Sequence, residues 1–268
     1  MRKMSLVLPF FLLLFTCTQV PVSGRRQLQL VPESELLQLS SESYAQVKDS
    51  IPVVTGTPQS NLVQRVGQNL RTAVEKYLQD QNSSDRIKDF KWEYNLFQDT
   101  VVNAWAMPGA LVGVNTGILP VTRDELGLAV VMGHEIAHAV AHHGNERMSQ
   151  LLLVELGGMA LSEALSKQPQ TTQQLALVAF GLGAQLGIVL PYSRLQESEA
   201  DQLGMIFMAM AGYDPRAAVA FWERMAAQQN QGQPPEFLST HPSYDERLKN
   251  LEKYLPEAMK YYNGQQTS

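Results

Sequence analysis

Four of the five histidines in this 268-residue chain lie within ten residues of one another. Two of them belong to the sequence H-E-I-A-H at residues 134–138, an H-E-x-x-H motif. Residues four apart share one face of a helix, so both imidazoles can bind one metal ion, and Glu135 beside that face can reach an attacking water. The motif therefore predicts a zinc site with a general base, provided that it lies on a helix. Two buried histidines that bind no metal are the alternative.

A catalytic zinc site needs a third protein ligand and one open position. The only cysteine is Cys17, so a carboxylate is the expected donor. Residues 192–201 carry three acids on an expected helix, where Glu197 and Asp201 share a face and Glu199 points about 200° away. A charge run of this kind is more often a solvated helix face, so composition alone does not assign the ligand.

The surrounding elements indicate an α+β fold with a small sheet. A capping-box pattern at residues 122–125 and a natural C-cap at Gly144 predict one helix with the motif in its middle. Alternation of apolar and polar residues at positions 90–96 is typical of a half-buried strand. In all, we expect helices at residues 33–48 and 59–78, strands at residues 90–96, 101–107 and 110–115, and only helices after residue 121.

Residues 175–190 form an apolar stretch that glycines and glutamines interrupt. Its length is too short to cross a bilayer, and its glycines allow close packing of helices. We therefore expect a buried helix here rather than a membrane-seeking hairpin.

The N-terminus has the pattern of an export signal. Arg2 and Lys3 precede an apolar run at residues 4–15, which is too short to cross a bilayer. Leu-Phe-Thr-Cys at residues 14–17 resembles a lipobox, which predicts a signal segment at residues 1–16 and a lipid anchor on Cys17. Ordinary secretion, with Cys17 removed in the signal peptide, is the alternative.

The charge pattern excludes one class of partner. The formal net charge is −5, and Lys and Arg occur in short pairs at most. A nucleic-acid binder would carry a basic patch, so we expect no nucleic-acid partner.

Four segments together resemble a peptidase family. They are the H-E-I-A-H motif, an S-R-x-x-E-x-E-A-D helix at residues 193–201, Asn103–Ala106 upstream and Ser239–Ser243 downstream. In this order they resemble the gluzincin peptidases that include the CAAX prenyl proteases and the HtpX-type membrane peptidases. The likeness is greater to the branch with the mitochondrial stress-activated inner-membrane protease and bacterial periplasmic lipoprotein metallopeptidases. It runs from about residue 31 to 255.

The resemblance implies roles for individual residues. It places the zinc ligands at His134, His138 and Glu197, with Glu135 as the general base and Asp201 as the acid that orients a ligand imidazole. It implies that His241 stabilises the oxyanion or occupies the open metal position in a resting state; a turn residue is the alternative. It implies a substrate-binding edge strand, whose residues are Asn103, Ala104, Trp105 and Ala106. We expect His142 at the solvated end of the helix, and we read His143 as structural because it is turned about 140° from His138.

The sequence thus predicts a mostly helical, zincin-like metallopeptidase with a sheet of three to four strands. We expect a tether with one helix at residues 17–57 and the zinc metallopeptidase domain at residues 58–262. The expected function is a zinc endopeptidase, with one Zn2+ per chain, that cleaves misfolded or membrane-associated polypeptides in the bacterial periplasm or envelope. A non-catalytic or latent zinc-containing chaperone or assembly scaffold is the alternative. Glu135 argues against a purely structural zinc site, which needs no general base.

Overall fold

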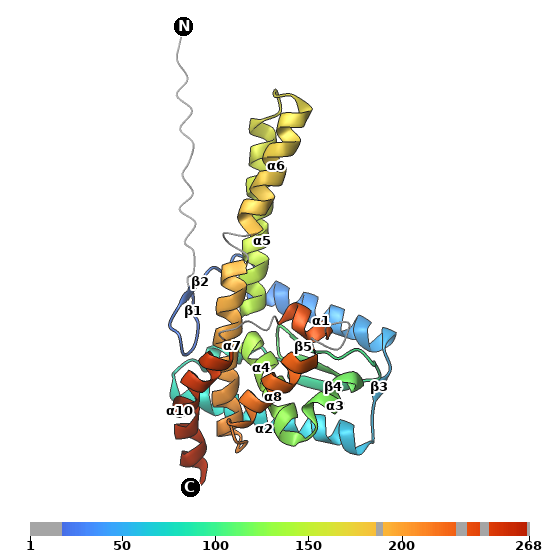
Figure 1. Ribbon diagram of the computed structural model, residues 1–268, viewed down its shortest axis with the longest axis vertical. Coiled ribbons are helices and arrows are strands. Elements are labelled where there is room, and N and C mark those ends of the chain that lie inside the picture. The colour runs from blue at the N-terminus through green and yellow to red at the C-terminus, as the bar shows by residue number, and fades with distance from the viewer. Residues whose placement is uncertain (1–17, 186–189, 229–234, 242–246, 267–268) are drawn as a thin grey trace.

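The computed structural model describes residues 18–185, 190–228, 235–241 and 247–266. Helices predominate, and the strands precede residue 116 (Figure 1). The helices are α1 (Glu33–Ser50), α2 (Pro58–Asp80), η1 (Ser84–Ile87), η2 (Thr116–Ile118), α3 (Leu119–Thr122), α4 (Glu125–Val140), α5 (His143–Ala164), α6 (Gln170–Ala184), α7 (Leu190–Met210), α8 (Ala217–Gln228), α9 (Glu236–Thr240) and α10 (Arg247–Gln266). The strands are β1 (Thr18–Gln19), β2 (Arg26–Gln27), β3 (Val53–Val54), β4 (Glu93–Phe97), β5 (Ala104–Met107) and β6 (Leu111–Asn115).

A four-stranded sheet in the order β3-β4-β6-β5 confirms the expected α+β fold. Strands β4 and β6 are parallel, and β3 and β5 add to them antiparallel. Successive side chains of a strand point to opposite faces. Tyr94 and Leu96 therefore join the core with α2 and α4, whereas Phe97 packs with Tyr44 of α1 on the other face. Trp92 has a φ of 47°, which explains why β4 starts at residue 93 and not at the expected residue 90.

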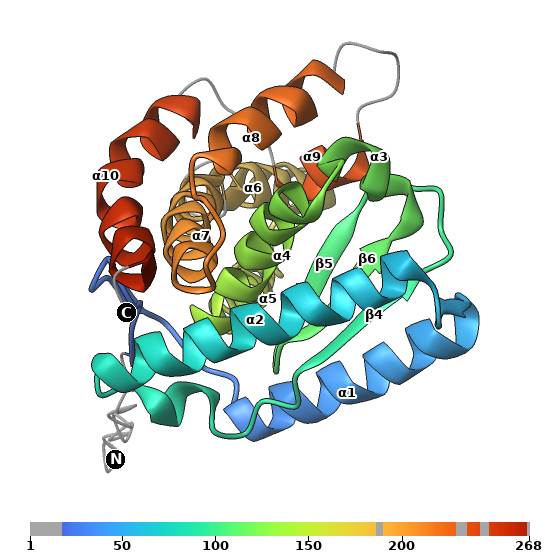
Figure 2. The ribbon, with the colours of Figure 1, turned by 90° about the horizontal axis from the view of Figure 1, so that it is seen from below.

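Helix α4 lies in the middle of the molecule, between the sheet and α7 (Figure 2). Every residue from Gly127 to Val140 is buried. Two glycines let α4 and α7 touch backbone to backbone: a Cβ on Gly204 would lie 3.0 Å from the His134 nitrogen, and one on Gly133 would lie 3.2 Å from the Gly204 carbonyl oxygen. This close approach brings side chains of α7 within reach of the histidines on α4.

The ends of α4 differ from the expected ones. Its N-cap is Asp124 and not the expected Thr122. Asp124 accepts a hydrogen bond from the Gly127 nitrogen, and Arg123, whose φ is positive, separates α3 from α4. At the other end, α4 stops at Val140, where Arg86 Nε donates to the Val140 carbonyl oxygen. His142 adopts a left-handed conformation with φ 57°, and α5 begins at the next residue. Gly144 therefore lies inside α5 and caps nothing.

Helices α5 and α6 form a pair that projects from the body of the molecule (Figure 1). The expectation of a buried helix at residues 175–190 is wrong for the part that the structure describes, because Leu175, Val178 and Leu182 of α6 are largely exposed. The reason is that α6 packs mainly on α5, and two helices without a third layer cannot enclose a core. Residues 186–189 lie outside the described residues.

Several N-terminal expectations cannot be compared with the structure. Residues 1–17 lie outside the described part, so the signal segment and the lipid anchor on Cys17 remain predictions, as do the domain limits. Segment 18–50 packs on the body; for example, Tyr44 Oη donates to the Val112 carbonyl oxygen at 2.8 Å. None of the helices described here has both the length and the apolar character that a membrane span requires.

Candidate metal centre

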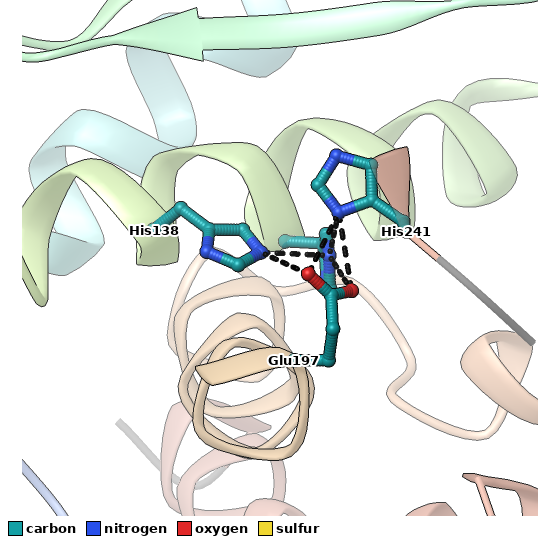
Figure 3. A group of neighbouring side chains, drawn as sticks. His138, Glu197 and His241 are labelled. Carbon is teal, nitrogen blue, oxygen red and sulfur yellow. Dashed lines mark hydrogen bonds and ion pairs between the residues drawn. The ribbon is translucent and has the colours of Figure 1, made fainter. Parts of the chain in front are cut away.

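Four buried side chains that can bind a metal converge where α4 meets α7. They are His134 and His138 on α4, Glu197 on α7, and His241, which follows α9. Figure 3 shows His138, Glu197 and His241 pointing toward one another. The donor atoms of all four lie within 4.8 Å of one another.

The distances between these donors fit a single tetrahedral ion. Nε2 of His134 lies 3.1 Å from Nε2 of His138 and 3.2 Å from Nδ1 of His241. The Glu197 carboxylate lies 3.3 Å from Nε2 of His134, 3.2 Å from Nε2 of His138 and 3.1 Å from Nδ1 of His241. Ligands about 2.0–2.1 Å from a tetrahedral ion are about 3.3 Å apart. These five distances therefore suit one bound metal ion.

The charge states also suit a cation. Burial raises the pKa of Glu197, but the nearby His241 and His138 outweigh it and hold that pKa well below its usual value. Burial lowers the pKa of His138 well below its ordinary value, which keeps the imidazole neutral with a free lone pair. Burial also lowers the pKa of His134, but hydrogen bonds with Asp201 and Glu197 outweigh it and raise the pKa to about 9. The surroundings of His134 thus stabilise positive charge.

Glu135 lies beside the donors without belonging to their set. It is buried, and its Oε1 is 3.2 Å from Nε2 of His241. Within the described residues, Oε1 of Glu135 has no hydrogen-bond partner. A buried carboxylate oxygen that is left unpaired costs stability. Its position next to the metal donors is the one that a proton acceptor would need.

Asp201 and Arg247 contact the far side of His134. Oδ1 of Asp201 lies 2.9 Å from Nδ1 of His134, and Arg247 Nη2 donates to the same oxygen at 2.6 Å. A carboxylate on the second nitrogen of a metal-binding histidine fixes its tautomer and ring orientation. Asp201 thus contacts the His134 ring, and its role in orienting a metal ligand stays a prediction. The sequence analysis missed Arg247, which is fully buried, stacks on the Trp222 ring and has no distinguishing motif.

His143 and Glu199 support His138 in the same way. Nδ1 of His143 lies 2.9 Å from Nδ1 of His138, and Nε2 of His143 lies 3.1 Å from Oε2 of Glu199. Glu199 also accepts hydrogen bonds from Arg25, at 2.9 Å, and from Ser23. The angle of 140° that separated His143 from His138 assumed one continuous helix, and it does not apply because α4 ends at Val140. His143 therefore contacts a candidate ligand, which sequence reasoning missed.

His142 is not at a solvated helix end. Its side chain is largely buried, and Nε2 lies 3.2 Å from the Arg86 carbonyl oxygen. Burial lowers its pKa to about 3. The left-handed backbone at this residue turns the side chain away from the metal donors toward η1.

Strand β5 holds the residues expected to bind substrate. Ala104, Trp105 and Ala106 belong to β5, and Asn103 immediately precedes it. Within the described residues, β5 pairs only with β6, so its other edge is unpaired. The segment before this strand contacts α9, because the Phe237 nitrogen donates to the Val102 carbonyl oxygen. A small pocket lies where the end of this strand meets α1 and the junction of α4 and α5, and Ala106, Pro108 and His138 are among the residues that line it.

Comparisons with known proteins identify relatives of this chain. Residues 65–255 match the model of "Peptidase family M48". The chain is 39% identical over 173 residues to "Mitochondrial metalloendopeptidase OMA1" of Schizosaccharomyces pombe, covering 64% of this chain and 49% of the relative. It is 31% identical over 264 residues to "Metalloendopeptidase OMA1, mitochondrial" of Homo sapiens, covering 96% and 49%. It is 31% identical over 166 residues to "Beta-barrel assembly-enhancing protease" of Yersinia pestis, covering 59% and 34%. The chain thus spans about half the length of most of its mitochondrial relatives.

These relatives contradict the expected location. The sequence predicted a bacterial periplasmic or envelope protein. The relatives that match over most of this chain, such as those of Homo sapiens and Saccharomyces cerevisiae, are eukaryotic and are named as mitochondrial enzymes. The prediction is therefore wrong: an apolar N-terminal run does not identify the compartment.

Proposed function

This chain belongs to peptidase family M48, and we propose that it is a zinc-dependent endopeptidase in which His134, His138 and Glu197 hold the metal. The observation that carries the proposal is the buried convergence of these donors, 3.1–3.3 Å apart, with Glu135 next to them. Histidine and carboxylate donors without a thiolate, with the buried carboxylate of Glu135 beside them, favour catalytic over structural zinc.

The side chains around the centre have distinct tasks. Zinc bound by these donors would supply Lewis acidity and a water activated near neutral pH. Glu135 takes the proton from the attacking water and passes it to the leaving amine, which its buried carboxylate beside the donors is placed to do. Asp201 and His143 hold the ring planes of His134 and His138 through the nitrogens that face away from the centre.

The substrate is a polypeptide that lies along β5. An extended peptide can pair with the unpaired edge of Ala104–Met107 and thereby pass the pocket beside His138. Backbone pairing tolerates varied side chains, which suits a protease of misfolded proteins. The likeness to a protease named for β-barrel assembly supports membrane-associated proteins as substrates and a task in protein quality control.

A latent form of the same enzyme is the second candidate. His241 favours it, because Nδ1 of this residue stands at the fourth corner of the donor set while Nε2 faces Glu135. An imidazole in that position excludes the attacking water. Cleavage would then require that His241 move away, for example when a substrate or partner displaces α9.

Casein digestion by the full chain tests both candidates. We expect wild type to produce fragments and His241→Ala to produce them several-fold faster, because the substitution empties the fourth position. Ser239→Ala, which changes an exposed side chain of α9 outside the donor set, is the control and should cleave like wild type. A loss of about 10²–10³-fold in His241→Ala would instead assign His241 to oxyanion stabilisation. Intact casein with all three proteins would contradict the endopeptidase proposal and favour a scaffold.

A further inference from the structure

The N-terminal segment contacts the residues that support a candidate metal ligand. Strands β1 and β2 form a hairpin, and Arg25 stands at the end of its turn, where the Val20 nitrogen donates to the Arg25 carbonyl oxygen at 2.8 Å. From there the guanidinium of Arg25 binds Glu146 on α5 and Glu199 on α7. Arg25 lies before residue 65, where the match to the peptidase family begins. These contacts therefore come from outside the matched part of the chain.

The Arg25 guanidinium neutralises two buried carboxylates at once. Nε of Arg25 donates to Oε1 of Glu199 and Nη2 donates to Oε2, both at 2.9 Å, so the two side chains form a bidentate pair. Nη2 also donates to Oε2 of Glu146 at 2.7 Å. The side chains of Glu146 and Glu199 are only 1% and 3% exposed, so each charge needs a partner within the protein. Ser23 Oγ donates to Oε1 of Glu199 at 2.6 Å, and both oxygens of Glu199 are thereby held in place.

The fixed carboxylate of Glu199 determines where the protons lie on the next two rings. An ionised carboxylate only accepts hydrogen bonds, so Nε2 of His143, which lies 3.1 Å from Oε2 of Glu199, carries a proton and donates. Burial lowers the pKa of His143, so its ring is neutral and its Nδ1 has a lone pair. That lone pair faces Nδ1 of His138 at 2.9 Å, and Nδ1 of His138 must therefore donate. Nε2 of His138 then keeps the lone pair that a metal needs.

The opposite placement of the protons would disable His138 as a ligand. Its Nε2 lies 3.2 Å from Glu197 and 3.1 Å from Nε2 of His134, and with a proton there it could not bind a cation between them. We propose that Arg25 is a positioning residue of the metal centre. By fixing the carboxylate of Glu199 it sets the tautomer of His143, and His143 in turn leaves Nε2 of His138 free to bind the metal. This inference rests on the proposed role of His138 as a ligand.

The zinc affinity of the full chain tests this inference without relying on cleavage. Competition with a chromophoric chelator should show zinc binding about tenfold weaker in Arg25→Ala, at the lower end of the cost of losing support for a ligand. Arg26→Ala is the matched control, because it removes the next, exposed arginine of the same segment, and it should bind zinc like wild type. Wild-type affinity in Arg25→Ala would overturn this inference alone. Absence of zinc binding by wild type would overturn the proposed donor set as well.

Arg25→Lys separates positioning from stability. Loss of the cation in Arg25→Ala leaves two buried carboxylates without their partner and should also lower the Tm. Lysine keeps the positive charge, so the chain should stay folded, but an ammonium is a point charge that cannot grip both oxygens of Glu199 as a planar fork does. We therefore expect zinc binding several-fold weaker than wild type in Arg25→Lys. Wild-type affinity in this variant would show that charge alone suffices and would overturn the positioning role.

A double-mutant cycle shows whether Arg25 acts through Glu199. In a Glu199→Ala background, Arg25→Lys should weaken zinc binding no further, because the intermediate group is already gone. Additive losses would mean that the two residues act independently, and they would contradict the proposed path.

NMR of the imidazole nitrogens in the metal-free, isotope-labelled chain gives a readout that a loss of stability alone does not move. We expect His143 to carry its proton on Nε2 in wild type and in Arg26→Ala, and to show a mixture of both neutral tautomers in Arg25→Lys. An unchanged tautomer of His143 in Arg25→Lys would overturn the inference.

Discussion

Replacing Glu135 with glutamine is expected to lower casein cleavage by at least about a hundredfold while zinc content and thermal stability stay close to wild type. A general base contributes about 10²–10⁴-fold to such a reaction, and an amide cannot accept the proton. Glu135 is not one of the four donors, and glutamine has the same shape, so neither the centre nor the packing of α4 should change. Cleavage assays, metal analysis and thermal unfolding of the same preparation measure the three quantities.

The control for this prediction lies on the same helix. Glu125→Gln makes the identical chemical change in the first turn of α4, where the carboxylate binds Arg65 and Tyr213 far from the centre. We expect it to cleave casein like wild type. Full activity in Glu135→Gln would sink the assignment of the general base, and a loss of zinc in that variant would show that Glu135 is a ligand.

Replacing Glu197 with alanine is expected to weaken zinc binding by more than about a hundredfold. Its carboxylate is the one anionic donor, and both of its oxygens lie within 3.3 Å of the imidazole nitrogens that surround them. Loss of a residue that only supports a ligand costs about 10–100-fold in metal affinity, and loss of the ligand itself costs more. Competition with a chromophoric zinc chelator measures the affinity.

Glu199→Ala is the matched comparison for Glu197→Ala. Both acids are on α7, but among the described residues Glu199 contacts His143 and the N-terminal segment and none of the four donors, so its loss should weaken zinc binding by less than the loss of Glu197. Both variants are made in the His241→Ala background, which prevents a third imidazole from replacing the carboxylate. A larger loss in Glu199→Ala would assign the ligand to Glu199 and contradict the proposed donor set.

The local pattern of the sequence predicts the motif helix and most of the sheet. A spacing of four residues is a property of the helix itself, so His134 and His138 had to share a face, and the structure places both in one buried centre. The same reasoning placed Glu197 and Asp201 on one face of a helix and Glu199 on another. In the structure Glu197 contacts the other metal donors, Asp201 contacts the outer nitrogen of His134, and Glu199 contacts His143.

Features that depend on a break in the helix could not be predicted in this way. The left-handed conformation of His142 interrupts the helical repeat of 3.6 residues per turn. An angle counted along α4 therefore does not give the direction of the His143 side chain. Arg247 reaches Asp201 from a helix that is 46 residues away in sequence, and no local spacing encodes such a contact. Exposure of α6 was mispredicted because an apolar helix has the same composition whether protein or another medium covers it.

Removal and return of the metal tests the central claim most directly. The full chain is dialysed against a strong chelator, checked by circular dichroism for retained helix, and assayed on casein before and after addition of zinc. We predict that cleavage disappears with the metal and returns when about one equivalent of zinc per chain is added. Cleavage that continues at the original rate in metal-free protein would contradict the account.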